Sequence, residues 1–281
     1  MSDPPTTTMP IPPPSEPRKR RWLVPTVVGV GAFSLGLIIG AAFFGVGQTS
    51  GAPPAGAPPA PRPPGTCTDR ITTIIPEGTG RSFSDESGGE YYLHNNNWND
   101  TAGGNSVITA CDYDNWNAVS DIPDHSDLSV QTYLNVHRDY DDEPLANIIS
   151  ADFAATGPHC AGCIWNIAFD VWIGDEFSHE LMIWTENWGQ RPAGDVVDTA
   201  SIGGHDYQVW RSGSGDGGIL TYLSVTPQTS GTMPLAAFFA DVRARGWTPT
   251  TTWQVDYGVE VVDTNGNPEQ FDVTDFSITD G

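Results

Sequence analysis

Three acidic residues of this chain lie in apolar or aromatic stretches and could carry out acid–base chemistry. The first is Glu180, in the stretch His179–Thr185. A period of two places its side chain on one face of a short strand, together with Met182 and Trp184. A carboxyl group beside an indole ring suits sugar chemistry, because the acid acts on a glycosidic bond while the ring packs against the apolar face of a pyranose. A surface glutamate on a half-buried strand would give the same pattern.

Two further stretches each place one acid on such a face. Residues 253–260 have a polar face that ends at Glu260, and Gly258 two positions earlier leaves space for a ligand. In residues 165–172, Asp170 shares its face with small, polar and aromatic side chains. Two carboxyl groups across a sugar bond, with pKa values pushed apart by their surroundings, are what glycoside hydrolysis requires. The period of two assigns faces but does not say that the three strands are neighbours.

The charge of the chain argues against several classes of function. The chain has 281 residues and a formal net charge of −23, and residues 67–281 hold seven basic side chains against 33 acidic ones. Such a domain would repel a nucleic-acid backbone, whereas a neutral ligand is acceptable. The only lysine is Lys19, so residues 67–281 lack a lysine for a Schiff base or for a phosphate-binding loop.

The N-terminal part consists of three segments of different composition. Residues 1–21 are rich in Pro, Thr and Ser and end in four basic residues, which predicts a disordered cytoplasmic tail. Residues 22–46 carry no charge and are long enough to span a bilayer as an anchor; a cleaved signal segment is the alternative. Residues 47–66 are rich in Pro, Ala and Gly, which is typical of an extended linker. We therefore expect residues 67–281 at the extracellular face of the membrane, or secreted after cleavage.

The four cysteines fit an oxidising compartment. There we expect two disulfides, Cys67–Cys111 and Cys160–Cys163. A redox-active pair should open a helix after a strand, whereas the close pair here precedes a strand. A zinc site is disfavoured because there is no second close cysteine pair and no paired histidines.

Short β-type runs separated by turn residues follow from residue 67, which is typical of an antiparallel sandwich or barrel. Only residues 234–245 have the pattern of a helix, with four apolar residues at positions i, i+3, i+4 and i+7. Pro234 stands at its start and Gly246 just past its end. We expect this helix to pack against a sheet and to have no catalytic part.

These stretches resemble glycoside hydrolase family 12, the small β-jelly-roll endoglucanases, over essentially all of residues 67–281. Residues Glu180–Trp184 resemble the family's nucleophile motif, and residues Tyr257–Glu260 resemble the strand that carries the acid/base. Residues Asn166–Trp172 resemble the strand whose aspartate hydrogen-bonds the nucleophile. Residues Asn95–Trp98 resemble an asparagine-asparagine-x-tryptophan motif whose tryptophan stacks on a sugar.

The resemblance implies an all-β jelly roll of two packed antiparallel sheets, with a concave cleft and one helix. It implies a retaining endo-β-1,4-glucanase acting on cellulose, mixed-linkage glucan or xyloglucan without a metal or cofactor. Glu180 would be the nucleophile, Glu260 the acid/base and Asp170 the residue that orients Glu180, with the two glutamate carboxyl groups about 5–5.5 Å apart. The substrate-binding residues that it implies are Trp98, Asn95, Asn96, Met182, Trp184 and Pro192.

Some residues depart from the family pattern. Val261 and Val262 follow the acid/base where the family frequently has a proline and an aromatic residue, and the Cys160–Cys163 pair is not a general family feature. A non-catalytic carbohydrate-binding jelly roll at the cell surface is the alternative, but it predicts that an acid would be missing. The partners that we expect are a β-glucan and, through residues 22–46, the membrane, with a monomeric catalytic domain.

Overall fold

The computed structural model describes residues 71–74, 79–86, 88–97, 105–123, 129–174, 178–213 and 218–281. The predicted tail, membrane segment and linker lie outside the described residues, as do Cys67 and Trp98. Within the described ranges, no helix combines the length and the apolar character needed to cross a membrane.

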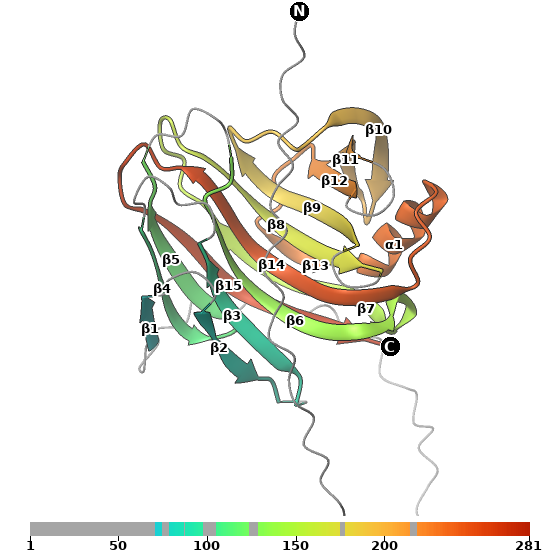
Figure 1. Cartoon of the computed structure of the whole chain (residues 1–281), viewed down its shortest axis with the longest axis horizontal. Helices are drawn as coiled ribbons and strands as arrows, with labels where there is room; N and C mark the ends of the chain where they lie inside the picture. The colour runs from blue at the N-terminus through green and yellow to red at the C-terminus, as the bar shows by residue number, and fades with distance from the viewer. Residues whose placement is uncertain are drawn as a thin grey trace, which may run out of the picture. The chain divides into compact units, whose positions relative to one another are not determined.

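The described residues form two β-sheets and one α-helix, as Figure 1 shows. The smaller sheet has the order β1 (Ile71–Ile74), β4 (Asn105–Asp112), β5 (Asn115–Asp121), β15 (Glu269–Asp280), β7 (Ile148–Thr156), β13 (Ser230–Met233). The larger sheet has the order β10 (Asp195–Ile202), β11 (His205–Ser212), β12 (Gly218–Ser224), β9 (His179–Trp188), β8 (Ile164–Ile173), β14 (Thr251–Asp263), β6 (Thr132–Pro144), β3 (Glu90–Asn96), β2 (Thr79–Ser84). This arrangement confirms the predicted all-β fold of two sheets with one helix. The prediction of purely antiparallel sheets is wrong at one place, because β12 runs parallel to β9.

Aromatic side chains from both sheets form the core between them. Phe153 of β7 meets Phe169 of β8 edge-on at 5.5 Å, and Phe276 of β15 stacks on Tyr257 of β14 at 5.8 Å. Such pairs add to the stabilisation that comes from burying apolar area. The core therefore lies against one face of the larger sheet, and alternation along each strand sends every second side chain to the other face.

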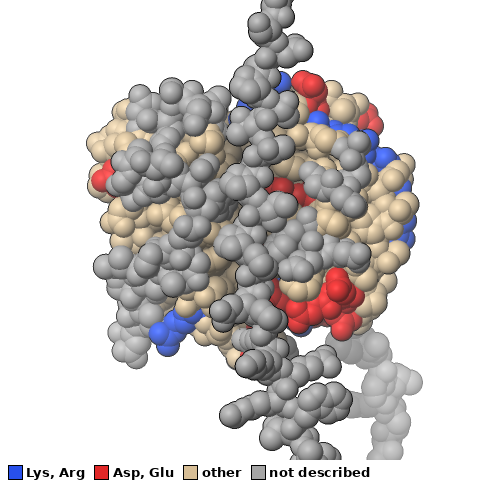
Figure 2. All heavy atoms as spheres, viewed as in Figure 1, with Lys and Arg blue, Asp and Glu red and all other residues tan. Residues whose placement is uncertain are grey.

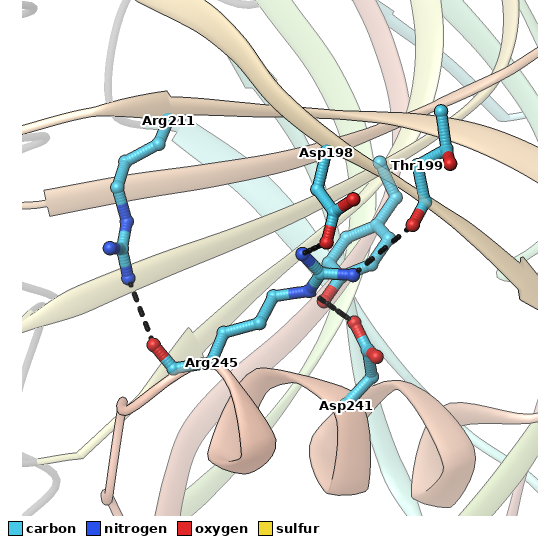
Figure 3. A network of polar contacts seen from close by, with 6 residues as sticks. Asp198, Thr199, Arg211, Asp241 and Arg245 are labelled. Carbon is cyan, nitrogen blue, oxygen red and sulfur yellow. Dashed lines mark hydrogen bonds and ion pairs between the residues drawn. The ribbon is translucent and has the colours of Figure 1, made fainter.

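The helix α1 (Leu235–Ala244) buries the four apolar residues of the predicted stripe, and it contacts β7. Its C-terminal end is tied to the edge of the larger sheet by Arg245, as Figure 3 shows. The guanidinium group donates to Asp198 of β10 at 2.9 Å and to Asp241 of α1 at 2.5 Å, and Arg211 of β11 donates to the Arg245 carbonyl at 3.5 Å. The helix is thus fixed to the sheet, as the sequence predicts.

Candidate active site

The larger sheet carries a second, smaller apolar cluster on the face that is turned away from the core. Ala168 of β8 with Met182 and Trp184 of β9 form this cluster, separate from the main core. We call this the site face of the larger sheet. In the view of Figure 2, the basic side chains that can be seen lie toward the upper right and the lower left.

The three predicted acids lie on adjacent strands of this sheet. Glu180 is on β9, Asp170 on β8 and Glu260 on β14, and β8 lies between the other two strands. Their chain neighbours Leu181 and Val259 belong to the main core, so the acids project from the site face. The structure thus brings together three side chains that a period of two could only assign to faces.

The register of the strands sets the spacing of the acids. Glu180 is opposite Trp172, which is two positions along β8 from Asp170. Glu260 is opposite Asn166, further along the same strand. Glu180 and Glu260 thus lie on the two strands that flank β8, opposite positions 172 and 166 of that strand, and the charge of Glu260 acts on Glu180.

Burial governs the ionisation of both glutamates. Glu180 is 9% exposed and Glu260 3% exposed. Desolvation raises the pKa of Glu180, and the negative charge of Glu260 raises it further. Desolvation also raises the pKa of Glu260 to about 7, against the opposing effect of hydrogen bonds from Asn166 and Gln190. Near neutral pH this pair therefore holds a proton, and the pKa of about 8 for Glu180 against about 7 for Glu260 favours Glu180 as its holder before Asp170 is considered.

The surroundings of Asp170 also favour its protonated form. Its pKa is raised well above its ordinary value, first by burial and then by the charges of Glu180, Asp256 and Glu260, while a hydrogen bond with Trp172 opposes the rise. Its Oδ1 is buried without a hydrogen-bond partner. A protonated carboxyl group of this kind can donate a hydrogen bond to an ionised neighbour.

A fourth acid, Asp256, stands on the site face although we did not predict a role for it. It is 4% exposed, lies directly opposite Asp170 on β8 and opposite His137 on β6, and buries its Oδ1 without a partner. Burial raises the pKa of its carboxyl group, and the charges of Asp139 and Glu180 add to this effect. The alternation along residues 253–260 already placed Asp256 beside Glu260, and that signal could have identified it.

Two side-chain amides bind Glu260, and sequence reasoning assigned a role to neither. Asn166 Nδ2 donates to Glu260 Oε2 at 2.5 Å, and Gln190 Nε2 donates to the same oxygen at 3.4 Å. Asn166 could have been found because it shares the face of Asp170 on β8. Gln190 lies in the loop after β9, where no periodicity marks it.

The apolar cluster beside Glu180 packs tightly. Ile219 and Leu223 of β12 pack against it, and the Trp184 indole donates to Met182 Sδ at 3.4 Å. Trp184 is only 2% exposed, so most of its ring contacts protein. Met182 and Trp184 therefore form an apolar support next to Glu180.

The other predicted substrate-binding residues have different positions. Asn96 lies on the site face, opposite Tyr133 of β6, whereas Asn95 points to the other face. There the Asn95 amide donates to the Ser106 carbonyl at 2.8 Å and ties β3 to β4 of the smaller sheet. Pro192 is buried in the loop that follows β9.

The Cys160–Cys163 disulfide is present as predicted. Cys111 is also disulfide-bonded, and its predicted partner Cys67 lies outside the described residues. Among the described residues, one group of three side chains has metal-ligand spacing: Cys160, Cys163 and Glu269. Both sulfur atoms of that group are bonded to each other, so it does not fit a metal ion.

Comparison with known proteins points to a single family. Residues 89–279 match the family model of glycosyl hydrolase family 12. Similar solved structures include a family 12 xyloglucanase from Bacillus licheniformis, with 19% identity and a TM-score of 0.64, covering 75% of this chain and 100% of that one. The xyloglucanase domain of a type three effector from Sinorhizobium fredii, solved with cellobiose, has 22% identity and a TM-score of 0.62, covering 75% and 99%. Endoglucanase 3 from Trichoderma harzianum has 17% identity and a TM-score of 0.64, covering 76% and 99%. At these identities the structures show a shared fold.

Proposed function

Because the chain belongs to glycosyl hydrolase family 12 and is a glucan hydrolase, we propose that it cleaves β-1,4-glucans within the chain by the retaining mechanism. One observation carries the mechanism: Glu180 and Glu260 are buried on one face, on the two strands that flank β8, and the charge of Glu260 raises the pKa of Glu180. Glycosidases act with a pair of carboxyl groups, and the resemblance to the family implies the retaining use of this pair.

In the first step, the Glu180 carboxylate attacks the anomeric carbon and forms a glycosyl ester. The bond to the leaving oxygen breaks, and Glu260 gives its proton to that oxygen. In the second step, Glu260 takes a proton from a water molecule, whose oxygen attacks the anomeric carbon and releases Glu180. The enzyme returns to its starting state with the configuration of the sugar retained.

The first step requires Glu180 to be ionised although burial raises its pKa. Asp170 supports this state, since burial and the neighbouring charges favour its protonated form and its buried Oδ1 has no hydrogen-bond partner. A hydrogen bond from Asp170 to Glu180 would favour the charged form of the nucleophile and leave the shared proton on Glu260. This role for Asp170 agrees with the one that the family resemblance implies.

The substrates that we propose are cellulose, mixed-linkage glucan and xyloglucan. Two of the similar structures are xyloglucanases and one of these was solved with cellobiose, which supports a β-1,4-linked glucose backbone. Product analysis on a panel of these glucans tests the proposal, with the anomeric form of the first product followed by NMR. We expect the β-anomer first; an α-anomer would contradict retention, and binding without release of reducing ends would support the non-catalytic alternative.

We also propose that the protein acts outside the cytoplasm, held by residues 22–46 or released after cleavage. The uncharged run and the Cys160–Cys163 disulfide support this location. Fractionation of cells with an antibody against residues 67–281 tests it. Recovery of the protein from the soluble cytoplasmic fraction would contradict the proposal.

A further inference from the structure

The two oxygens of the Glu260 carboxyl group differ in their contacts, because both amide donors bind the same oxygen. Asn166 Nδ2 lies 2.5 Å from Oε2 and Gln190 Nε2 lies 3.4 Å from it. We propose that Asn166 and Gln190 are positioning residues that fix Glu260 through Oε2, so that Oε1 is the oxygen that gives and takes the catalytic proton. The inference rests on the proposed role of Glu260 as the acid/base.

Asn166 is held firmly by its place in the sheet. It lies directly opposite Glu260 in the β8–β14 register, and its side chain is completely buried. Its chain neighbours Trp165 and Ile167 belong to the main core. While Glu260 is ionised, turning the amide over would bring its oxygen against a carboxylate oxygen, so Nδ2 faces Glu260 in that state.

Gln190 lies in a loop, but the residues just before it are anchored. Asn187 Nδ2 donates to the Gln190 carbonyl at 2.7 Å, and the Trp188 indole donates to the Cys160 carbonyl at 2.8 Å. Gly189 forms a bridge with Trp165 and has a φ of 73°, which favours glycine. The Cys160–Cys163 disulfide links the two ends of residues 160–163, the segment whose Cys160 carbonyl accepts the hydrogen bond from Trp188.

The chemistry of the two donors decides where the proton resides. An amide N–H can donate a hydrogen bond but cannot accept one. A proton on Oε2 would therefore face two donors and find no acceptor among them. A proton on Oε1 does not face these two N–H groups, and Oε2 keeps both hydrogen bonds throughout the reaction.

The same contacts adjust the ionisation of Glu260. Hydrogen bonds donated to a carboxylate favour the charged form and lower the pKa, which opposes the effect of burial. Removing either amide is therefore expected to raise the pKa of Glu260. Because the acid must be protonated for the first step, the alkaline limb of kcat/KM should then move to higher pH.

The test uses Gln190→Ala and Asn166→Ala in the full-length protein, with pH profiles of kcat/KM on a soluble β-glucan. Asn166→Ala should shift the alkaline limb upward by about one pH unit, with a smaller shift for Gln190→Ala, whose hydrogen bond is longer. Gln270→Ala is the matched control, since Gln270 donates to the Asp272 carboxylate at 2.8 Å in the smaller sheet. That variant should keep the wild-type limb.

If kcat/KM falls in both variants while the alkaline limb of its pH profile stays in place, the two residues have only a structural role and the inference is overturned. Gln190 is partly exposed, so its variant remains informative if Asn166→Ala does not fold. The variant Glu260→Ala distinguishes a failure of this inference from a failure of the proposed function. Loss of activity on glucan, with activity kept on an aryl glycoside whose leaving group needs no proton, supports Glu260 as the acid. An unchanged profile for that variant would refute the proposed function itself.

Discussion

Asp170 and Asp256 face each other across β8 and β14, and both bury an Oδ1 atom that has no hydrogen-bond partner. Two carboxyl groups at this spacing resist double ionisation, and Glu180 and Glu260 add charge to the same region. The carboxyl groups on the site face therefore keep their protons to a higher pH in the folded protein than in the unfolded chain.

The first prediction is that stability falls as the pH rises from about 5 to 8. An unfolded carboxyl group has a pKa of about 4, whereas folding raises that of Glu260 to about 7 and raises those of Asp170, Glu180 and Asp256. The folded state therefore binds more protons in this window, so its stability is complete below it and is lost as the pH rises through the folded pKa values. Thermal unfolding at several pH values measures the effect.

Asp256→Asn should reduce this loss of stability. The amide has the same shape and cannot ionise, so the Tm at pH 8 should rise by about 2–4 °C for each kcal/mol of repulsion removed. Asp142→Asn is the control, because Asp142 is exposed and its φ of 71° is tolerated by asparagine. Equal pH dependence in wild type and Asp256→Asn would show that this carboxyl group does not store a proton.

Glu180→Gln should abolish the release of reducing ends, with a loss of at least about a thousand-fold, while the protein remains folded. Glu186→Gln is the matched control on the same strand, since Glu186 is equally buried but contacts His159 instead of the other acids. That variant should retain its activity. Survival of activity in Glu180→Gln would mean that another residue is the nucleophile.

Azide distinguishes the roles of the two glutamates. With Glu180→Ala and an aryl β-glycoside, azide should restore turnover and give an α-glycosyl azide, because it attacks the anomeric carbon in a single displacement. With Glu260→Ala, azide should give the β-product, because the glycosyl ester on Glu180 still forms. Products of the opposite configuration would exchange the two assignments.

Cys160→Ser together with Cys163→Ser should destabilise the protein by about 2 kcal/mol, the value expected for closing so short a loop. Denaturant unfolding measures this change. The Trp188 indole should also lose its fixed contact with the Cys160 carbonyl, which a shift in tryptophan fluorescence would report. An unchanged unfolding midpoint would show that the loop is held by its other contacts, such as the stacking of His159 on Trp188 at 4.6 Å.

The sequence correctly predicted which side chains share one face of a strand, because alternation along a strand depends on local geometry alone. It separated Glu180 and Met182 from Leu181 and Ile183, which the structure places in different clusters. The same rule could not order the strands, since β8 and β14 are paired by contacts between residues far apart in sequence.

Motif resemblance could not show how single side chains are held. Asn95 lies in the stretch that resembles a substrate-binding motif, and its amide ties the two sheets together. Trp184 is nearly buried, which alternation cannot reveal because packing depends on β12 as well as β9. Gln190 lies in a loop and was found only through its distance to Glu260.

The central position of β14 has a consequence for how the chain folds. This strand lies between β6 and β8, although 94 residues separate Asn166 from Glu260. While the chain is being made, β6 and β8 have no partner between them until the last strands emerge. Folding that must join such distant segments is slow. A chain cut short before β14 would therefore lack both Glu260, the proposed acid/base, and the strand that joins the two halves of the sheet.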